Sequence, residues 1–412
     1  MINVLDFSGE SDDAIINSAI ANKDADGIVV IPAKENREPW ILDNAILLPE
    51  NTTVILNNCT IKLSDKCRDN FFRTANCGVG IEDVEKIHNV HINGIGNVIL
   101  EGADHPRSTG DSSKINTVPC PYYKEDLIKY ADWISKESKE SGELDFWDCH
   151  NHTYGTDFDK ENESHGGGWQ NIGILFANVE NFSINNITMK DYHCWGISIE
   201  AGSFGKITNI RFDAHMKKMI DGMVHNIENQ DGVDIRNGCN NILISDISGN
   251  TGDDVVALTA VADKTMRKSG NIHSTNVMHS DWSKRESGIR DIIIRNVIAS
   301  SNLCWLVRLL PVETKICNVI IDNIIDTSKD ASHSGTILLG DADGAYGNNL
   351  PDSMDGVTIS NVISNSYSNA VKILGYMKDS VITNVISKNR NADTIHIERE
   401  NALNNVQINN IL

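Results

Sequence analysis

The sequence predicts an all-β protein, a right-handed parallel β-helix in which short strands wind into coils that stack along one axis. Two observations lead to this prediction. One phrase, a β-branched residue, two mostly polar residues and a second β-branched residue, returns along the chain, and its closest copies start 23 residues apart, at Ile184 and Ile207 and again at Ile359 and Ile382. Short β-prone runs separated by Asn and Gly fill each unit, where a helical repeat would show a 3.6-residue pattern.

The repeated phrase also predicts which residues form the core. Stacked coils repeat about every 4.8 Å, so equivalent isoleucines lie above one another inside the solenoid. Asn tolerates the left-handed backbone conformation and suits the bends between strands or a ladder of amides. The wider intervals after Ile207 and Ile244 indicate either two coils or single coils with insertions. We expect seven isoleucines inside: Ile184, Ile207, Ile244, Ile294, Ile321, Ile359 and Ile382.

Two segments depart from the repeat. Residues 10–22 have a helical pattern with Ile15, Ile16 and Ala19 apolar, and are expected to cap the first coil. Residues 103–168 carry no coil phrase, but an amphipathic helix candidate followed by an aromatic and His-rich stretch. We therefore predict a single β-helix domain over residues 1–412, with 103–168 inserted as a loop and helix lobe beside the cleft.

Composition limits the partners. The 412 residues carry a net charge of −21, which argues against nucleic acid and against an anionic membrane surface. No uninterrupted apolar run reaches 18 residues, and the first residues show no secretory signal, so we expect a cytoplasmic protein or one whose signal has been removed. The nine cysteines are odd in number and scattered, which predicts free thiols rather than a disulfide framework. The composition makes no prediction of oligomeric state.

Three carboxylates stand out. Asp253 and Asp254 are adjacent at the start of an apolar strand, and Asp231 precedes them by 22 and 23 residues, close to one coil. Residues one period apart stack in a β-helix, so we expect the three to crowd one patch. Neighbouring carboxylates raise one another's pKa, which is a useful property for acid and base catalysis at neutral pH.

These residues carry a resemblance to the family 28 glycoside hydrolases, the polygalacturonase-like proteins of the pectin-lyase-like superfamily. The family has Asn-Thr-Asp-Gly-Ile/Val-Asp followed about one coil later by Gly-Asp-Asp. This chain reads Asn-Gln-Asp-Gly-Val-Asp from residue 229 and Gly-Asp-Asp from residue 252. The segments 6–15, 27–33 and 187–212 are also similar to the family. The resemblance covers most of residues 3–325.

The resemblance implies inverting hydrolysis of a pectin-type or related plant or microbial poly- or oligosaccharide, without a cofactor. Asp253 would be the general acid, and Asp231 and Asp254 would orient and deprotonate the attacking water. Asp234 would brace the turn. The family's Arg-Ile-Lys, which holds a uronate carboxylate, corresponds here to Arg308, Leu309 and Leu310, so that the Lys is replaced by Leu.

Further residues are candidates for substrate binding. No Gly-His-Gly follows the Asp pair, and His273 and His279 are the candidates by position. Trp305 could stack on a sugar ring or lie in the core, and Tyr346 could reach the same cleft as Arg308. His165 and Trp169 flank three glycines where the chain re-enters the stack. The spacing of His150 and His152 could suit a metal, but no third ligand is placed, and we predict no metal site.

Two alternatives remain open at this stage. A polysaccharide lyase on the same fold would use the crowded carboxylates as Ca²⁺ ligands and an Arg or Lys as base, and its unsaturated product would absorb in the ultraviolet. A carbohydrate-binding fibre such as a phage tailspike would use the β-helix as a scaffold.

Overall fold

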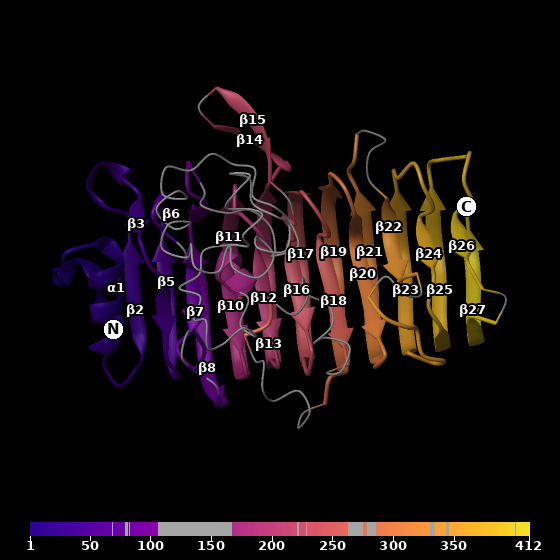
Figure 1. Ribbon diagram of the computed structural model, residues 1–412, viewed down its shortest axis with the longest axis horizontal. Helices are drawn as coiled ribbons and strands as arrows, with labels where there is room; N and C mark the ends of the chain where they lie inside the picture. Colours follow the sequence, from indigo (N-terminus) through magenta and orange to yellow (C-terminus); the bar gives the residue numbers. More distant parts are fainter. Residues whose placement is uncertain are drawn as a thin grey trace, which may run out of the picture.

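The protein is a right-handed parallel β-helix, seen in the computed structural model with its coils laid side by side from the N- to the C-terminus (Figure 1). The structure describes residues 1–105, 167–262, 275–277 and 286–412, apart from short gaps at 68, 79–80, 82, 221, 228, 330–333, 343–345 and 400. Within these residues, no helix is long and apolar enough to cross a membrane.

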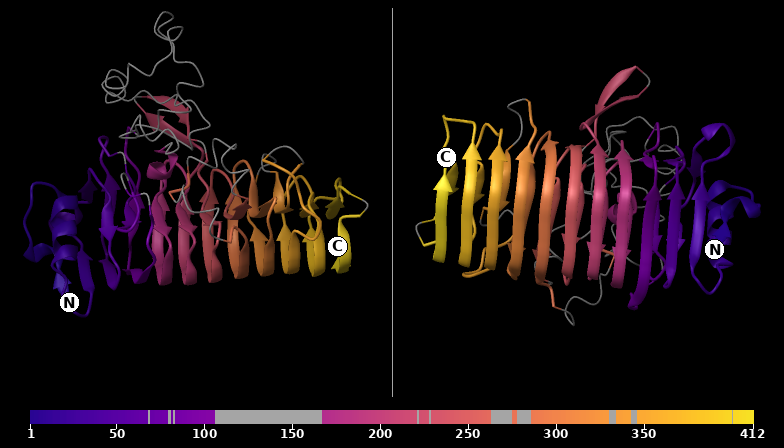
Figure 2. Two further views of the ribbon diagram at one scale, coloured as in Figure 1. Left: turned by 60° about the horizontal axis from the view of Figure 1, so that its bottom comes forward. Right: turned by 180° about the vertical axis from the view of Figure 1, so that it is seen from behind.

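Two sheets form the walls of the solenoid. Within each sheet the strands run parallel from the first coil to the last (Figure 2). Sheet A contains β1 (Ile2–Asn3), β2 (Ile28–Pro32), β5 (Thr52–Asn57), β8 (Ile87–Ile95), β11 (Val179–Lys190), β13 (Ser203–Asp213), β17 (Asn240–Thr251), β19 (Ile289–Ser301), β21 (Ile316–Asp326), β23 (Met354–Ser364), β25 (Met377–Ser387) and β27 (Leu403–Ile411), joined near the N-terminus by β3 (Trp40–Leu42), β6 (Thr60–Leu63) and β9 (Ile99–Glu101). Sheet B contains β4 (Ile46–Leu48), β7 (Phe72–Thr74), β10 (Ile174–Ala177), β12 (Ile197–Glu200), β16 (Val233–Arg236), β18 (Val256–Val261), β20 (Trp305–Val312), β22 (Gly335–Leu339), β24 (Val371–Ile373) and β26 (Ile395–Ile397).

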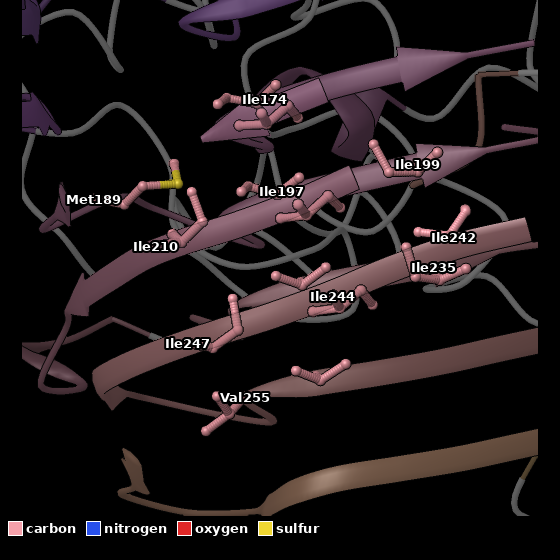
Figure 3. Close-up of a cluster of buried hydrophobic side chains, with 14 of the residues drawn as sticks. Ile174, Met189, Ile197, Ile199, Ile210, Ile235, Ile242, Ile244, Ile247 and Val255 are labelled. Carbon is pink, nitrogen blue, oxygen red and sulfur yellow. The ribbon is translucent and has the colours of Figure 1, made fainter. Parts of the chain in front are cut away.

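The repeated isoleucines form one continuous column through the core. Each pairs in register with the next, from Ile92 through all seven predicted positions to Ile408. All seven predicted side chains are fully buried, so the prediction is confirmed. Figure 3 shows part of this interior, where Ile199 and Ile235 from sheet B and Ile244 from sheet A lie in one apolar cluster.

Asn residues produce the three-residue spacing of the repeated phrase. In β23, Ile359 and Val362 both point inward, and Asn361 between them has a φ of 57°. Inward residues of a straight strand are two apart, so one residue in the left-handed conformation bends the strand and makes the interval three. The exposed amides then stack: Asn384 Nδ2 donates to Asn361 Oδ1 at 3.1 Å, and Asn410 Nδ2 to Asn384 Oδ1 at 3.1 Å. The predicted ladder lies on the outside of the bend.

Helix α1 (Asp12–Ala21) covers the first coil, as expected for residues 10–22. Ser11 starts the helix, since its side chain accepts a hydrogen bond from the backbone N–H of Ala14 at 3.3 Å. The buried face is Ile16, Ala19 and Ile20, whereas Ile15 is only partly buried. Three short 3₁₀ helices, Val4–Asp6, Glu35–Arg37 and Gly167–Asn171, complete the described helical structure.

Insertions at the turns account for the irregular spacing. β13 pairs directly with β17, and β17 with β19, so both long intervals are single coils that carry insertions. The first carries an antiparallel hairpin, β14 (Lys217–Ile220) and β15 (Met223–Asn226), which projects from the solenoid (Figures 1 and 2). The lobe predicted for 103–168 falls mostly outside the described residues, so its place beside the cleft stays a prediction. Seven cysteines are described, and all are free.

The isoleucine column gives a direct stability test. Ile294 is fully buried, whereas its neighbour Ile293 points outward and is 38% exposed. We expect Ile294→Ala to lower the free energy of unfolding by about 2–5 kcal/mol, because it leaves a cavity between two coils. Ile293→Ala, with the same change in side chain, is expected to cost less than about 1 kcal/mol. Denaturant unfolding of both variants measures the difference, and equal losses would contradict the assigned core face.

Candidate active site

The carboxylate patch lies where three neighbouring strands of sheet B begin. Val233 of β16 pairs with Val256 of β18, which pairs with Val307 of β20. Asp231 and Asp254 each precede their valine by two residues, so they occupy equivalent positions on successive coils. The backbone confirms this: Gly232 N–H donates to the carbonyl of Asp254 at 2.8 Å. The 23-residue spacing thus brings the two carboxylates together by stacking alone.

A glycine allows this close approach. A Cβ atom on Gly232 would lie 2.4 Å from the carbonyl oxygen of Val255 and 2.8 Å from the Phe212 ring. Any larger residue at this position would push the first turn away from the second. The Asp-Gly order in the motif is therefore a packing requirement of the patch.

Asp254 is held from two sides. It is 2% exposed, its Oδ1 accepts from the backbone N–H of Trp305 at 2.8 Å, and its Oδ2 lies 3.4 Å from Nη1 of Arg308. Burial raises the pKa of Asp254 to about 7, against the opposing effect of the Arg308 charge and with a further increase from Asp253. A carboxyl group with such a pKa can both accept and release a proton near neutrality.

Asp231 is buried and incompletely hydrogen bonded. It is 6% exposed, and its Oδ2 has no hydrogen-bond partner in the structure. Burial, followed by the neighbouring charge of Asp253, raises its pKa well above the ordinary value. An unpartnered buried carboxyl oxygen is costly to a fold, so its presence here indicates a role other than stability.

Asp253 is the member of the patch that solvent reaches. Its backbone is fixed, because its N–H donates to Gln230 O at 3.2 Å and its carbonyl accepts from Thr251 Oγ1 and Ser301 Oγ at 2.6 and 2.8 Å. Its Oδ1 accepts from the N–H of Asp254 at 2.9 Å, while the side chain stays partly exposed. A bound molecule can therefore touch Asp253 more readily than the two buried carboxylates.

Two residues that the sequence did not single out also belong to the patch. The ligand atoms of Cys304, Asp253 and Asp254 all lie within 4.8 Å of one another. Burial and the charge of Asp254 raise the pKa of the Cys304 thiol, which therefore keeps its proton beside the carboxylates. Asp341, from the turn after β22, forms an ion pair with Arg308 Nη2. Neither has a local sequence signal, because both come from the following coils.

Asp234 faces the same side as Arg308. It is in register with Ala257, which is in register with Arg308, and it is 2% exposed. Its Oδ2 has no hydrogen-bond partner in the structure, and burial raises its pKa well above the ordinary value, although the charge of Arg236 acts in the opposite direction. Asp234 thus adds a fourth carboxyl group to the patch.

The other expected substrate-binding residues are placed differently. Trp305 is 7% exposed, and its ring packs against Gly335, where a Cβ would lie 2.1 Å from it. Trp169 is 3% exposed and lies under Arg73, with 5.1 Å between the guanidinium carbon and the ring centroid. Both side chains are buried in the structure. Tyr346 lies beside the site, with Arg308 5.5 Å from its ring centroid. His165, His273, His279, His150 and His152 lie outside the described residues.

A second apolar cluster covers the outer face of sheet B next to the patch. It includes Trp169, Trp195 and Leu310. Arg236 lies 4.5 Å from the Trp195 ring centroid and donates to Thr275 Oγ1 at 3.0 Å, and Val277 N–H donates to Glu200 Oε2 at 3.0 Å. The described part of the insertion in the long coil, 275–277, is thus fixed to the solenoid beside the site.

The donor atoms of Asp253, Asp254 and Cys304 could hold a metal ion. Ca²⁺ prefers six to eight oxygen ligands, whereas a thiol suits softer ions such as Zn²⁺. Both oxygens of Asp254 already accept hydrogen bonds, so this set fits the Ca²⁺ centre of a lyase poorly.

Comparisons with known proteins agree with the fold and the motif. The family model of glycosyl hydrolases family 28 matches residues 151–281, which contain Asp231, Asp253 and Asp254. A polygalacturonase from Erwinia carotovora ssp. carotovora is similar in structure, with a TM-score of 0.56, 13% identity and coverage of 99% of this chain and 92% of the other.

Two similar structures have other roles. The surface protein and adhesin PfbA of Streptococcus pneumoniae has a TM-score of 0.58 and 14% identity, covering 99% of this chain and 97% of its own. A tailspike mutant of the E. coli bacteriophage HK620 has a TM-score of 0.51 and 12% identity, covering 100% of this chain and 65% of its own. No curated protein sequence matches. At these identities the structures show the fold alone, a parallel β-helix. The match to the family 28 model, which covers residues 151–281, supports a glycoside hydrolase.

Proposed function

We propose that the protein cleaves a pectin-type or related poly- or oligosaccharide by inverting hydrolysis at the carboxylate patch. The observation that carries the proposal is the meeting of Asp231, Asp253 and Asp254 on two successive coils, with two of them buried and raised in pKa. Inverting hydrolysis needs one carboxyl group that protonates the leaving oxygen and another that deprotonates a water molecule.

Asp253 is the proposed acid, because it is the exposed member of the trio and can reach a glycosidic oxygen. Burial raises the pKa of its two neighbours, Asp231 and Asp254, so these groups can hold a proton close to Asp253. The Cys304 thiol lies beside Asp253. Because the thiol is protonated, it provides a hydrogen-bond donor next to this carboxylate.

Asp231 and Asp254 are the two carboxylates proposed to act as general base. Asp254 is fixed by the Trp305 N–H and by Arg308, so its position does not depend on bound sugar. Asp231 keeps one oxygen without a protein partner, and that oxygen can accept from a water molecule. Asp234 is a further buried carboxyl group close enough to interact with them through its charge.

The lyase alternative is less well supported by the groups at the patch. Elimination on this fold would need a side chain that removes a proton from the sugar. Arg308, the cation next to the trio in the part of the chain that the structure describes, is ion-paired with Asp254 and Asp341 and keeps its proton. The adhesin and tailspike neighbours keep a purely binding role as the other alternative.

Defined pectic and other plant oligosaccharides, incubated with the protein, test the proposal. Hydrolysis creates new reducing ends without ultraviolet absorption, whereas elimination creates an absorbing unsaturated sugar. Inversion is read from the anomeric form of the first product by NMR. An absorbing product would support the lyase, and binding without any product would support the binding protein.

Substitution of the acid gives a sharper test. We expect Asp253→Asn to reduce kcat by at least about 100-fold, the usual range for losing one acid-base group, with little change in melting temperature. Asp246→Asn is the matched control, because Asp246 is an exposed bend residue and Asn occupies the equivalent bend of other coils. Full activity in folded Asp253→Asn would refute the assignment of the acid.

The raised pKa of Asp231 predicts a pH effect on stability. A carboxyl group whose pKa is raised in the folded state contributes stability below its ordinary value of 3.8, and loses it as pH rises. Asn cannot ionise, so Asp231→Asn should melt progressively higher than the wild type as pH increases from 4 to 8. Asp246, whose pKa is lowered by hydrogen bonds from Ser245 and Asn296, is ionised throughout this pH range, so Asp246→Asn should run parallel to the wild type and is the control. Parallel melting curves for Asp231→Asn and the wild type would contradict this electrostatic account.

A further inference from the structure

The charges around the patch are unbalanced. Five carboxyl groups meet there, those of Asp231, Asp234, Asp253, Asp254 and Asp341. Among the described residues, Arg308 forms ion pairs with Asp254 and Asp341, and the buried Arg236 acts on Asp234 through its charge. A ligand that enters this region therefore meets mostly negative charge, even when some of the carboxyl groups are protonated.

Arg308 is already engaged at both ends of its guanidinium. Nη1 lies 3.4 Å from Asp254 Oδ2, and Nη2 is hydrogen bonded to Asp341 Oδ2. Only 16% of the side chain is exposed. Both terminal nitrogens of Arg308 thus already face a carboxylate, so a bound carboxylate would have to share the guanidinium with Asp254 and Asp341 or displace one of them.

The neighbouring outward position offers no second cation. Leu310 lies two residues beyond Arg308 on the same face of β20, and it is 3% exposed within the second apolar cluster. An apolar side chain that is packed in this way cannot compensate a negative sugar. Two separate features, a neutralised guanidinium and a buried leucine, therefore disfavour an anionic ligand at the same place.

We propose, on the basis of the hydrolytic function above, that the sugar unit bound beside Arg308 is uncharged, either a neutral sugar or a methyl-esterified uronic acid. Asp341 is the residue that sets this specificity, because it occupies the guanidinium nitrogen that a uronate would use. A free uronate would add another negative charge next to five carboxyl groups, whereas sugar hydroxyls can donate hydrogen bonds to them.

Asp341→Asn removes the masking charge and keeps the shape. The amide can still accept from the Ala342 N–H, which now donates to Asp341 Oδ1 at 2.7 Å. Oligogalacturonides of one length, either free or methyl-esterified, form a substrate pair that differs in the charge and one methyl group of each uronic acid. We expect the wild type to prefer the ester by at least about tenfold in kcat/KM, a difference of about 1.4 kcal/mol, and Asp341→Asn to lose most of that preference.

A binding measurement separates this inference from the hydrolytic proposal. Calorimetry with galacturonic acid and its methyl ester requires no turnover and uses the wild type, Asp341→Asn and Asp355→Asn. The last is the matched control, because Asp355 pairs with Lys378 on sheet A and its loss changes the net charge equally. A shift towards the free acid in Asp341→Asn alone supports the inference.

Two results would overturn the inference. One is a wild type that binds or cleaves the free acid as well as the ester. The other is an acid-to-ester preference that Asp341→Asn leaves unchanged, which includes the case in which neither sugar binds to either protein. A protein that shows the predicted change in binding but cleaves no oligosaccharide would refute the hydrolytic proposal alone.

Discussion

The in-register stacking of each coil on the one before it determines most of this structure. Parallel strands lie about 4.8 Å apart, and the column from Ile92 to Ile408 shows that each coil repeats the inward residues of its neighbour. A coil can therefore gain residues only at a turn, as the hairpin β14–β15 does. The strands on either side keep their register, and the position of any turn residue follows from the coil that carries it.

The candidate active site depends on the same stacking of coils, but it lowers the stability of the fold. Stacking places Asp231 next to Asp254 and buries both, with the consequence that their carboxyl groups lose hydration and keep their protons to higher pH. An isolated turn could not hold two such groups together, because repulsion and hydration would separate them. The long column of buried isoleucines provides the stability that this arrangement requires.

Much of the fold could be predicted because a solenoid repeats locally what it does globally. The phrase around Ile359 records both an inward pair and the bend at Asn361, and the 23 residues from Asp231 to Asp254 equal one coil. The interval from Ile244 to Ile294 could not be resolved, since two coils and one coil with an insertion give the same spacing. Only the pairing of β17 with β19 decides it.

For a related reason, the remaining members of the site could not be predicted from the sequence. Cys304 and Asp341 lie in turns of variable length, so that their distance along the chain from Asp254 is no multiple of the repeat. The burial of Trp169 likewise depends on Arg73, almost a hundred residues earlier, and on the cluster that covers the outside of sheet B. Contacts of this kind arise between coils and leave no local pattern.

Arg308 connects the choice of sugar to the chemistry. Its charge lowers the pKa of Asp254, against the larger effect of burial, while Asp341 competes for the same guanidinium. A ligand or substitution that removes Asp341 from Arg308 leaves more of the positive charge to Asp254, which then releases its proton at lower pH. In the proposed mechanism, substrate charge and the pH range of catalysis are therefore coupled through one side chain. A change of specificity at Asp341 must alter the proton balance of the carboxylates next to it.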